Sequence, residues 1–590
     1  MQQIITILLI GFVFLTGCHT SGSTAGEYPV DGSLRDAIAD MPADPIAGAE
    51  RMMQSLTLRQ KIGQMFVVAA RGGFYPEYDA AWQRMNEAVT LYEVGGIMFF
   101  SGNIYEQAII TNRLQRISRL PLWVSQDMEF GAAMRLPEAT YFTPAMGIAA
   151  TGNPEYAYQK GRITALEAAA LGIHQIYAPV LDVNNNPLNP VINVRSFSEN
   201  PDTVARYGIA FMKGVHDAGV MSTAKHFPGH GDTDVDSHLD LPTLPFDYYR
   251  LSTLELIPFS KAIKAGLQSV MTAHIAIPEI ALNAANPGTL DPNITRALLR
   301  DSLDFGGMIV TDGMGMRGIR DFFEAGEAAV LAVKAGIDQI LLPTDLVEAM
   351  DAVQLAVLSG DISEERIDES VRRILTEKIR AGLFTESGVI DLEQLHHRIH
   401  VREHRMIADR IAQESVTLLK NEGDILPLDN DAFEHVVVVH LSDGRRRIQD
   451  HISRLLEQPF DTLTVIEMFP GQCDEDRKAA MSAVDSADLV IAVSHVAIRT
   501  AEGISLDETI SPIAEKLFVQ GRPGVAVSLG TPYAITSMAH ADAHVLGWSP
   551  HRQQQIAVAR ALLGFAPVNG RLQVSIPSMY TIGDGLTLDP

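Results

Sequence analysis

The residues best suited to chemistry are concentrated in one stretch, KHFPGHGDTDVDSH, at positions 225–238. It holds three His, three Asp and one Lys, and Pro228, Gly229 and Gly231 prevent a continuous helix. Burying so many titratable groups costs free energy unless the groups serve a site. The stretch therefore predicts a loop that is a metal site, an acid/base site or a solvated polar turn.

Metal binding is the least favoured of these three readings. His226 and His230 are four residues apart, a spacing that binds zinc well on one helical face, and the Pro-Gly pair between them excludes that helix. The three alternating Asp resemble the start of a calcium loop, but Ser237 and Thr243 stand where Gly and Glu are needed. We expect no metal and no other cofactor.

Acid/base chemistry is favoured by Asp236 and His238. In an extended segment, residues two apart point to the same side, so the Asp236 carboxylate would accept a hydrogen bond from Nδ1 of His238. That bond fixes the tautomer and leaves Nε2 free. An ordinary His pKa of about 6.5 suits proton transfer near neutral pH. The pair is expected to carry a proton.

Eight short apolar runs alternate with helical stretches in the first two thirds of the chain. Most are continuously hydrophobic, as strands buried on both faces should be. The runs are 65–70, 96–100, 122–125, 175–183, 220–225, 269–273, 308–311 and 339–342. Eight βα units over roughly 320 residues predict a (β/α)8 TIM-like barrel, with a doubly wound sheet as the minority alternative.

The barrel prediction places active residues just past the carboxyl ends of the strands. Polar residues do follow the runs. They are Asp127 and Glu129 after the third run, Asp182 and Arg195 after the fourth, Lys225 at the end of the fifth, His274 after the sixth and Asp312 after the seventh. Since these positions were not used to choose the runs, they support the barrel independently.

We assign 46–385 to the barrel, 386–410 to a linker and entry helix, and 411–590 to a smaller α/β sandwich domain. The second region has apolar runs at 436–440, 464–468, 489–493, 525–529, 545–548 and 572–576, which predict an open sheet covered by helices. It shows no polar cluster comparable to the loop. Its expected role is structural or substrate-shaping.

The N-terminus predicts export. Residues 4–16 are largely apolar, too few to span a bilayer and suited to a signal peptide. The following Cys18 ends a sequence that resembles the bacterial lipobox, so we expect a lipoprotein signal at 1–17, acylation of Cys18 and a tether at 18–45 that anchors the protein to the cell envelope. A plain secretory signal is the alternative, because no Lys or Arg precedes the apolar run. The net charge of -26 disfavours nucleic acid as a partner.

Several motifs together resemble the family-3 glycoside hydrolases, specifically β-N-acetylglucosaminidases of NagZ type. The resemblance covers roughly residues 50 to 580. The motifs are the 225–238 loop, Gln126-Asp127-Met128-Glu129, APVLDV at 178–183, Arg195-Ser196-Phe197, AHIAIP at 273–278, IVTD at 309–312 with Met316, and AQESVTLLKNEGDILPL at 412–428.

The resemblance implies roles for the matching residues. Asp312 would be the nucleophile, with Asp236 and His238 as the acid/base dyad. The residues expected to hold the sugar hydroxyls are Asp127, Arg195, Lys225 and His226. His230 would support the loop. Two departures, Phe130-Gly131 and Gly313-Met314, leave all these groups in place but differ from the usual family residues.

Structural roles remain open for some of these residues. Lys225 would pair with Asp127 or Asp312 in a barrel-top salt bridge, Arg195 would cap loop carbonyls, and Asp312 would cap the following helix. The expected substrate is a GlcNAc-containing oligosaccharide from the cell wall, hydrolysed with retention. The alternatives are a phosphorylase, another β-glycosidase of the family, and a lipid-tethered glycan-binding protein.

Overall fold

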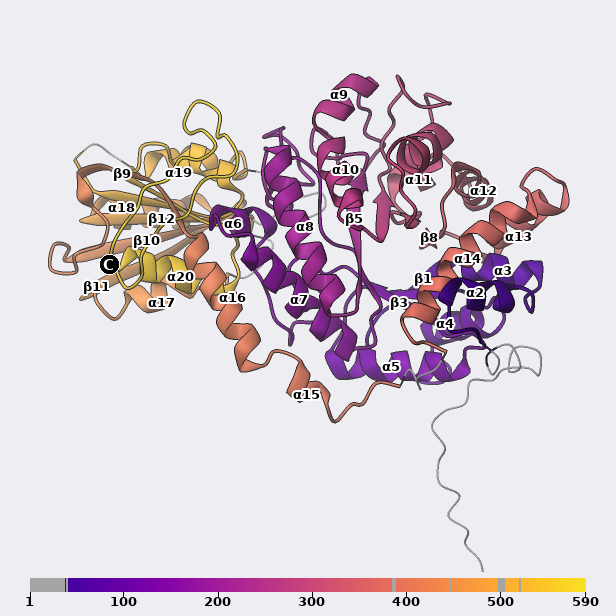
Figure 1. Ribbon diagram of the computed structural model, residues 1–590. Coiled ribbons are helices and arrows are strands. Elements are labelled where there is room, and N and C mark those ends of the chain that lie inside the picture. Colours follow the sequence, from indigo (N-terminus) through magenta and orange to yellow (C-terminus); the bar gives the residue numbers. More distant parts are fainter. Residues whose placement is uncertain (1–37, 39–40, 385–388, 445–447, 497–504, 519–520) are drawn as a thin grey trace, which may run out of the picture.

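The computed structural model describes residues 38, 41–384, 389–444, 448–496, 505–518 and 521–590. The predicted signal peptide and Cys18 lie outside the described residues. Two bodies stand side by side in Figure 1, a barrel formed by the first part of the chain and a smaller domain in orange and yellow. None of the described helices combines the length and the apolar character needed to cross a membrane.

Eight parallel strands form the barrel, in the order β7-β6-β5-β4-β3-β2-β1-β8. They are β1 (Phe66–Ala70), β2 (Gly96–Phe99), β3 (Trp123–Gln126), β4 (Gln175–Ile176), β5 (Met221–Phe227), β6 (Ser269–Thr272), β7 (Met308–Thr311) and β8 (Ile340–Leu341). A parallel bridge between Val310 and Gln339 joins β7 to β8, and the N–H of Thr311 donates to the carbonyl of Gln339 at 3.0 Å. The predicted barrel is confirmed.

The fourth predicted run differs from the expected strand. Only Gln175–Ile176 is regular strand, and beyond it Val180 makes a single bridge to Lys225. Pro179 lies within the run and has no N–H for a regular ladder. The chain leaves the barrel here and forms the long segment 182–198 that carries Arg195.

Helices surround the strands. They are α2 (Pro45–Met53), α3 (Leu58–Gln64), α4 (Ala80–Thr90), α5 (Ile104–Ile117), α6 (Ala145–Ala150), α7 (Glu155–Ala170), α8 (Pro201–Asp217), α9 (Tyr248–Thr253), α10 (Leu256–Lys264), the π-helix η4 (Asn293–Ser302), α11 (Arg317–Arg320), α12 (Ala325–Ala335), α13 (Leu346–Leu358) and α14 (Glu364–Arg380). Short 3-10 turns are η1 (Ala132–Met134), η2 (Asn193–Arg195) and η3 (Gly288–Leu290). Side-chain caps define several starts. Asn200, for example, accepts from the N–H of Thr203, and Pro201 occupies the first position of α8.

The two domains are joined by α15 (Leu395–Arg398) and α16 (Arg402–Ser415). The expected boundary between 410 and 411 falls inside α16. This helix contacts α6 and α7 of the barrel as well as α20 (Arg552–Leu562) of the second domain. It is therefore shared between the two domains.

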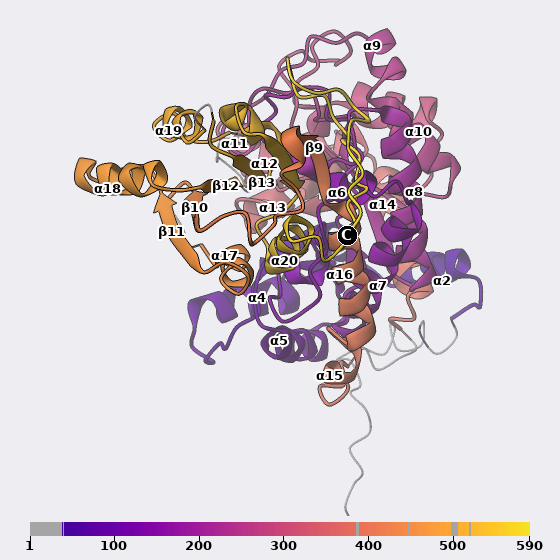
Figure 2. The ribbon, with the colours of Figure 1, turned by 90° about the vertical axis from the view of Figure 1, so that its left-hand side faces the viewer.

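The second sheet has the order β11-β10-β12-β13-β14-β9. Its strands are β9 (Thr417–Asn421), β10 (His435–Leu441), β11 (Thr462–Met468), β12 (Leu489–Val496), β13 (Gly524–Gly530) and β14 (Ala543–Gly547). All neighbouring pairs are parallel except β14 with β9. One face packs against α18 (Asp474–Asp485), α19 (Ser511–Lys516) and the 3-10 segment η6 (Pro532–Met538), and the other against α16, α17 (Ile452–Leu456) and α20. Figure 2 shows α18 and α19 on the opposite side of the sheet from α17 and α20.

One predicted strand of this domain is wrong. In 572–576 only Ile576 makes a bridge, to Tyr580, although Leu572, Val574 and Ile576 are fully buried. Their alternation reflects packing into the domain core and not pairing in the sheet. The edge beside β14 is instead covered by β9, the segment that directly follows α16.

Candidate active site

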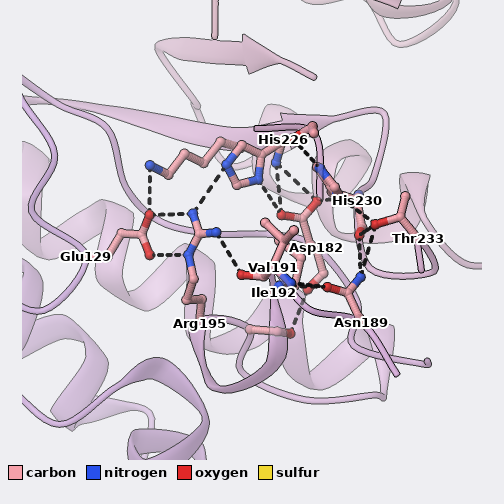
Figure 3. A network of polar contacts seen from close by, with 12 residues as sticks. Glu129, Asp182, Asn189, Val191, Ile192, Arg195, His226, His230 and Thr233 are labelled. Carbon is pink, nitrogen blue, oxygen red and sulfur yellow. Dashed lines mark hydrogen bonds and ion pairs between the residues drawn. The ribbon is translucent and has the colours of Figure 1, made fainter. Parts of the chain in front are cut away.

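The carboxyl end of the barrel gathers two acidic and two basic side chains. Lys225, at the end of β5, places Nζ 2.8 Å from Oδ1 of Asp127 and 2.8 Å from Oε1 of Glu129. Arg195 donates to both carboxylate oxygens of Glu129, each at 2.8 Å, and to the carbonyl of Val191 at 2.9 Å. The two parallel hydrogen bonds to Glu129 fix the plane of the guanidinium group. Glu129, which the sequence indicated only as a polar residue after the third run, thus orients both Arg195 and Lys225 (Figure 3).

Burial disfavours the charged forms of these four side chains, but each stays charged because it is paired with groups of opposite charge. Burial alone would raise the pKa of Glu129, but Arg195 and Lys225 hold that pKa well below its usual range. Burial would lower the pKa of Lys225, but Asp127 and Glu129 raise it above its ordinary value. The salt bridge expected between Lys225 and Asp127 is present, and Arg195 does bind a loop carbonyl. Both residues still line the barrel mouth.

Asp182 is the centre of a second polar group. It is fully buried and accepts a hydrogen bond from Nδ1 of His226 at 2.7 Å, as well as from the backbone N–H of His226 and of His230. Nε2 of His226 faces Nη2 of Arg195 at 3.4 Å, so the two polar groups are connected (Figure 3). Asp182 thereby holds the end of β5 and the beginning of the loop in place.

His230 lies inside the loop with both ring nitrogens bonded. Nδ1 is 2.7 Å from Oγ1 of Thr233, and Nε2 is 2.9 Å from Oγ of Ser237. Burial lowers the pKa of His230 to about 4, so the ring is neutral at physiological pH. This agrees with the loop-supporting role expected for it. Among the described residues, no group of three or more His, Cys, Asp or Glu is arranged to hold a metal ion.

The Asp236–His238 pair forms as expected, but by a different backbone geometry. The segment is a turn and not an extended strand, and the N–H of His238 donates to Oδ1 of Asp236 at 2.8 Å. The same oxygen lies 2.7 Å from Nδ1 of His238. The Asp236 side chain is 3% exposed and that of His238 is 37% exposed. The carboxylate is buried, and the imidazole reaches out of the loop.

Asp312 directly follows β7 and is partly buried. Its Oδ1 accepts from the N–H of Gly313 at 2.7 Å, while α11 begins only at Arg317, so Asp312 does not cap that helix. Burial would raise the pKa of Asp312, but its neighbours His226, His274, His238 and Lys225 lower it to about 2. Asp312 is therefore an ionised carboxylate at the end of β7.

His274 supports the turn that carries Asp312. Its Nε2 lies 3.1 Å from the carbonyl oxygen of Gly313, and its Nδ1 lies 3.0 Å from Oγ1 of Thr289. Both nitrogens are bonded, as expected for a barrel-top histidine without a catalytic task.

A cavity of about 550 Å³ is lined by His238 and by Gly313, the residue that follows Asp312. Its wall is mainly apolar. It includes His238, Val68, Ala69, Phe100, Gly313, Met316 and Leu342. The ion-paired residues stand at the ends of β3 and β5 and in the 182–198 segment, whereas the cavity is bounded by the ends of β1, β2, β7 and β8. The barrel mouth thus has an ion-paired half and a mainly apolar half, and Arg317 and Arg320 also line the latter.

Two contributors were not predicted as site residues. Asp182 was recognised only as a polar residue near a strand end, and its partners lie 44 and 48 residues away. Arg135 pairs with Oδ2 of Asp127, and its guanidinium lies 5.5 Å from the centre of the Phe100 ring. No local pattern singles out Arg135. All seven residues predicted for catalysis or sugar binding occupy the barrel mouth or its loop.

Comparison with known proteins agrees with this geometry. The model of the glycosyl hydrolase family 3 N-terminal domain matches residues 57–377, and that of the family 3 C-terminal domain matches residues 416–583. The chain belongs to glycosyl hydrolase family 3. It is a glycoside hydrolase with the two-domain architecture of that family.

Similar members of family 3 carry related names. β-Hexosaminidase A of Pseudoalteromonas piscicida is 31% identical over 552 residues, which cover 83% of this chain and 91% of that protein. A β-N-acetylglucosaminidase/β-glucosidase of Cellulomonas fimi is 28% identical over 83% of this chain and 88% of that protein. The structure of a family 3 β-N-acetylglucosaminidase from Paenibacillus sp. str. FPU-7 is similar with a TM-score of 0.79 and 33% identity, covering 89% of this chain and 100% of that one.

Proposed function

We propose that this glycoside hydrolase is a retaining, exo-acting β-N-acetylglucosaminidase that removes non-reducing terminal GlcNAc from cell-wall fragments. The observation that carries the proposal is the Asp236–His238 pair, whose imidazole lines a mainly apolar cavity, together with the low pKa of Asp312, whose neighbour Gly313 lines the same cavity. The names of the relatives from P. piscicida and Paenibacillus support the same activity.

Asp312 is the proposed nucleophile. A retaining glycosidase needs an ionised carboxylate beside the anomeric carbon. The low pKa of Asp312, about 2, provides the ionised form throughout the physiological range. Asp312 attacks the anomeric carbon, the bond from that carbon to the leaving oxygen breaks, and a glycosyl ester forms on the carboxylate.

His238 is the proposed acid and base. Its Nε2 gives a proton to the leaving oxygen in the first step. In the second step it takes a proton from water, which attacks the anomeric carbon and frees Asp312. Asp236 holds Nδ1 and stabilises the imidazolium, so one ring nitrogen stays oriented while the other exchanges the proton.

The charged half of the mouth would hold the sugar. Asp127, Lys225 and Arg195 are already held by ion pairs and His226 by its hydrogen bond to Asp182, so binding hydroxyl groups requires little reordering. We place the substituent on C2 and the leaving group in the apolar cavity, which is lined by His238 and by Gly313, the residue after Asp312. A 2-acetamido group suits such a cavity, whereas a glucoside has only a hydroxyl there.

The same cavity favours an acidic leaving sugar. Arg317 and Arg320 line it, and both pair with Asp321, at 2.7 and 3.4 Å. Their half-exposed guanidinium groups would meet a carboxylate such as the lactyl group of MurNAc. We therefore expect GlcNAc–MurNAc to be a better substrate than chitobiose.

Product analysis tests the proposal. The purified enzyme is incubated with GlcNAc–MurNAc and with chitobiose, with and without phosphate, and the products are followed by NMR. We expect GlcNAc to appear first as the β-anomer. GlcNAc-1-phosphate as the main product would instead establish a phosphorylase, and an initial α-anomer would exclude retention.

Two variants separate catalysis from binding. Asp312→Asn should lower kcat by at least about 10³-fold, because the nucleophile is lost. Asp301→Asn changes an exposed carboxylate on η4 in the same way and should leave kcat unchanged. Unchanged hydrolysis by Asp312→Asn would reject the nucleophile assignment. A protein that binds GlcNAc oligomers without releasing sugar would be a glycan-binding protein.

We also propose that the enzyme is exported and anchored through acylated Cys18. The support is the apolar segment and the lipobox-like sequence alone. The test is metabolic labelling with a fatty acid followed by fractionation. Cys18→Ser should abolish labelling and release an active enzyme from the membrane fraction, and unlabelled wild-type protein would point to a plain secretory signal.

A further inference from the structure

The turn that carries Arg195 is anchored in the second domain. Nδ2 of Asn193 donates to Oγ1 of Thr531 at 3.1 Å. The next residue, Val194, is buried in the hydrophobic cluster of the second domain, which also contains Tyr533 and Trp548. Arg195 follows directly, and its guanidinium donates two hydrogen bonds to Glu129 in the barrel. Asn193 and Val194 are thus held by the second domain, whereas Arg195 binds Glu129 in the barrel.

A matching anchor lies at the other end of the same segment. Nδ2 of Asn184, two residues after Asp182, donates to the hydroxyl of Tyr533 at 3.0 Å. Asn184, Asn193, Thr531 and Tyr533 are all buried. Among the described residues, the amide oxygens of Asn184 and Asn193 have no hydrogen-bond partner. For both Asn184 and Asn193, the hydrogen bond from Nδ2 to the second domain is therefore the one that holds the side-chain amide in place.

The anchoring residues occupy a rigid place in the second domain. Thr531 and Tyr533 come immediately after β13, at the carboxyl edge of the sheet. The N–H of Thr531 donates to the carbonyl of Val496 at the end of β12, at 3.1 Å, and Oγ of Ser528 donates to the carbonyl of Thr531 at 2.7 Å. In open α/β sheets this edge is where ligands usually bind. Here the barrel segment 184–194 occupies it.

The backbone of Asn193 explains why an external anchor matters. Its φ of 42° lies in the left-handed region, which is unfavourable for a residue with a side chain, although Asn tolerates it better than most. Inside the barrel, Asn189 also holds the turn by accepting from the N–H groups of Val191 and Ile192. Loss of the second-domain bonds should therefore loosen the turn without unfolding it.

We infer that Thr531 and Tyr533 are positioning residues of the active site, which fix Arg195 for sugar binding from the second domain. The inference rests on the proposed role of Arg195 in holding the substrate. A binding side chain must be held to within about 0.5 Å of its productive place. The second domain supplies that constraint through Asn193, Val194 and Asn184.

Steady-state kinetics of Thr531→Val and Tyr533→Phe test the inference. Each change removes one hydroxyl and keeps the shape of the side chain. Because Arg195 would bind the sugar equally in the ground and transition states, KM should rise about fivefold for each variant while kcat stays within about twofold. Thr531→Ser keeps the hydroxyl and should retain the wild-type KM.

Tyr580→Phe is the matched control. The Tyr580 hydroxyl lies 2.6 Å from Nδ1 of His544 inside the second domain, so the variant loses one buried bond without touching the barrel segment. It should leave KM unchanged even where it lowers the melting temperature. An equal rise of KM in Tyr580→Phe would show a general loss of stability and would overturn the inference.

A double-mutant cycle with Arg195→Ala separates the inference from the proposed function. If Tyr533 acts through Arg195, Tyr533→Phe should raise KM no further in the Arg195→Ala background. A full fivefold rise in that background would overturn the inference. If KM is unchanged in Arg195→Ala itself, the proposed role of Arg195 in sugar binding is rejected. If KM rises in Arg195→Ala but stays unchanged in Thr531→Val and Tyr533→Phe, only the positioning role of the second domain is rejected.

Discussion

The barrel mouth contains two Asp–His pairs with almost the same internal geometry and different surroundings. In both, a carboxylate oxygen lies 2.7 Å from Nδ1 of the imidazole. The His226 side chain is 6% exposed and its Nε2 faces Arg195, whereas the His238 side chain is 37% exposed and lines the cavity. The first pair is enclosed, whereas the second is open to the cavity, as the proposed acid/base role requires.

The difference shows that an Asp–His pair does not define a catalytic site by itself. The carboxylate orients the ring equally in both pairs. What differs is access of the second nitrogen to a reacting atom, which general acid catalysis requires. Burial and the neighbouring guanidinium remove that access from His226. The next predictions separate the two pairs experimentally.

The largest difference is expected from His238→Ala. Loss of the acid should lower kcat/KM for GlcNAc–MurNAc by about 10²–10⁴-fold. An aryl glycoside with a good leaving group needs little protonation, so its glycosylation rate, measured by pre-steady-state kinetics, should fall far less. His396→Ala, an exposed histidine on α15, is the control. Equal losses on both substrates would remove His238 from the role of acid.

His226→Ala should behave differently. The Asp182 carboxylate would be left buried with fewer donors, at a cost of about 1–3 kcal/mol in the free energy of unfolding. Displacement of the sugar-binding groups should lower kcat/KM by roughly a hundredfold or less, and equally for natural and aryl substrates. Urea unfolding and the two substrates measure these effects. A strong dependence on the leaving group would contradict the contrast between the pairs.

The smallest expected effect follows from the pKa of Asp312, which the histidines of both pairs help to lower. Its folded pKa of about 2 is below the ordinary value of about 3.9. The ionised form therefore contributes stability above pH 4, on the order of 2 kcal/mol, which is lost as the pH falls through the folded pKa. The difference in unfolding free energy between wild type and Asp312→Asn should shrink from pH 7 to pH 3. A difference independent of pH would show that the charge is not stabilised.

The sequence alone predicted those features that depend on local order. Residues 225–238 indicated an acid/base loop because Asp236 and His238 are close enough to meet without help from the rest of the chain. Asp312 was indicated because carboxyl ends of parallel strands meet at one edge. The apolar runs predicted the barrel, since strands buried on both faces must be hydrophobic throughout.

Tertiary structure decided which polar groups are enclosed and which lie open to the cavity. Alternating apolar residues at 572–576 predicted a strand, but burial alone produces the same alternation, and β9 took the edge position. Asp182 and His226 are separated by 44 residues, and Arg195 and Glu129 by 66. Asn193 and Thr531 are separated by 338. Contacts at such separations depend on how the whole chain folds, because no local spacing specifies them. For that reason the sequence indicated the residue types of the site, and only the fold showed which histidine lines the cavity and how the second domain contacts the segment that carries Arg195.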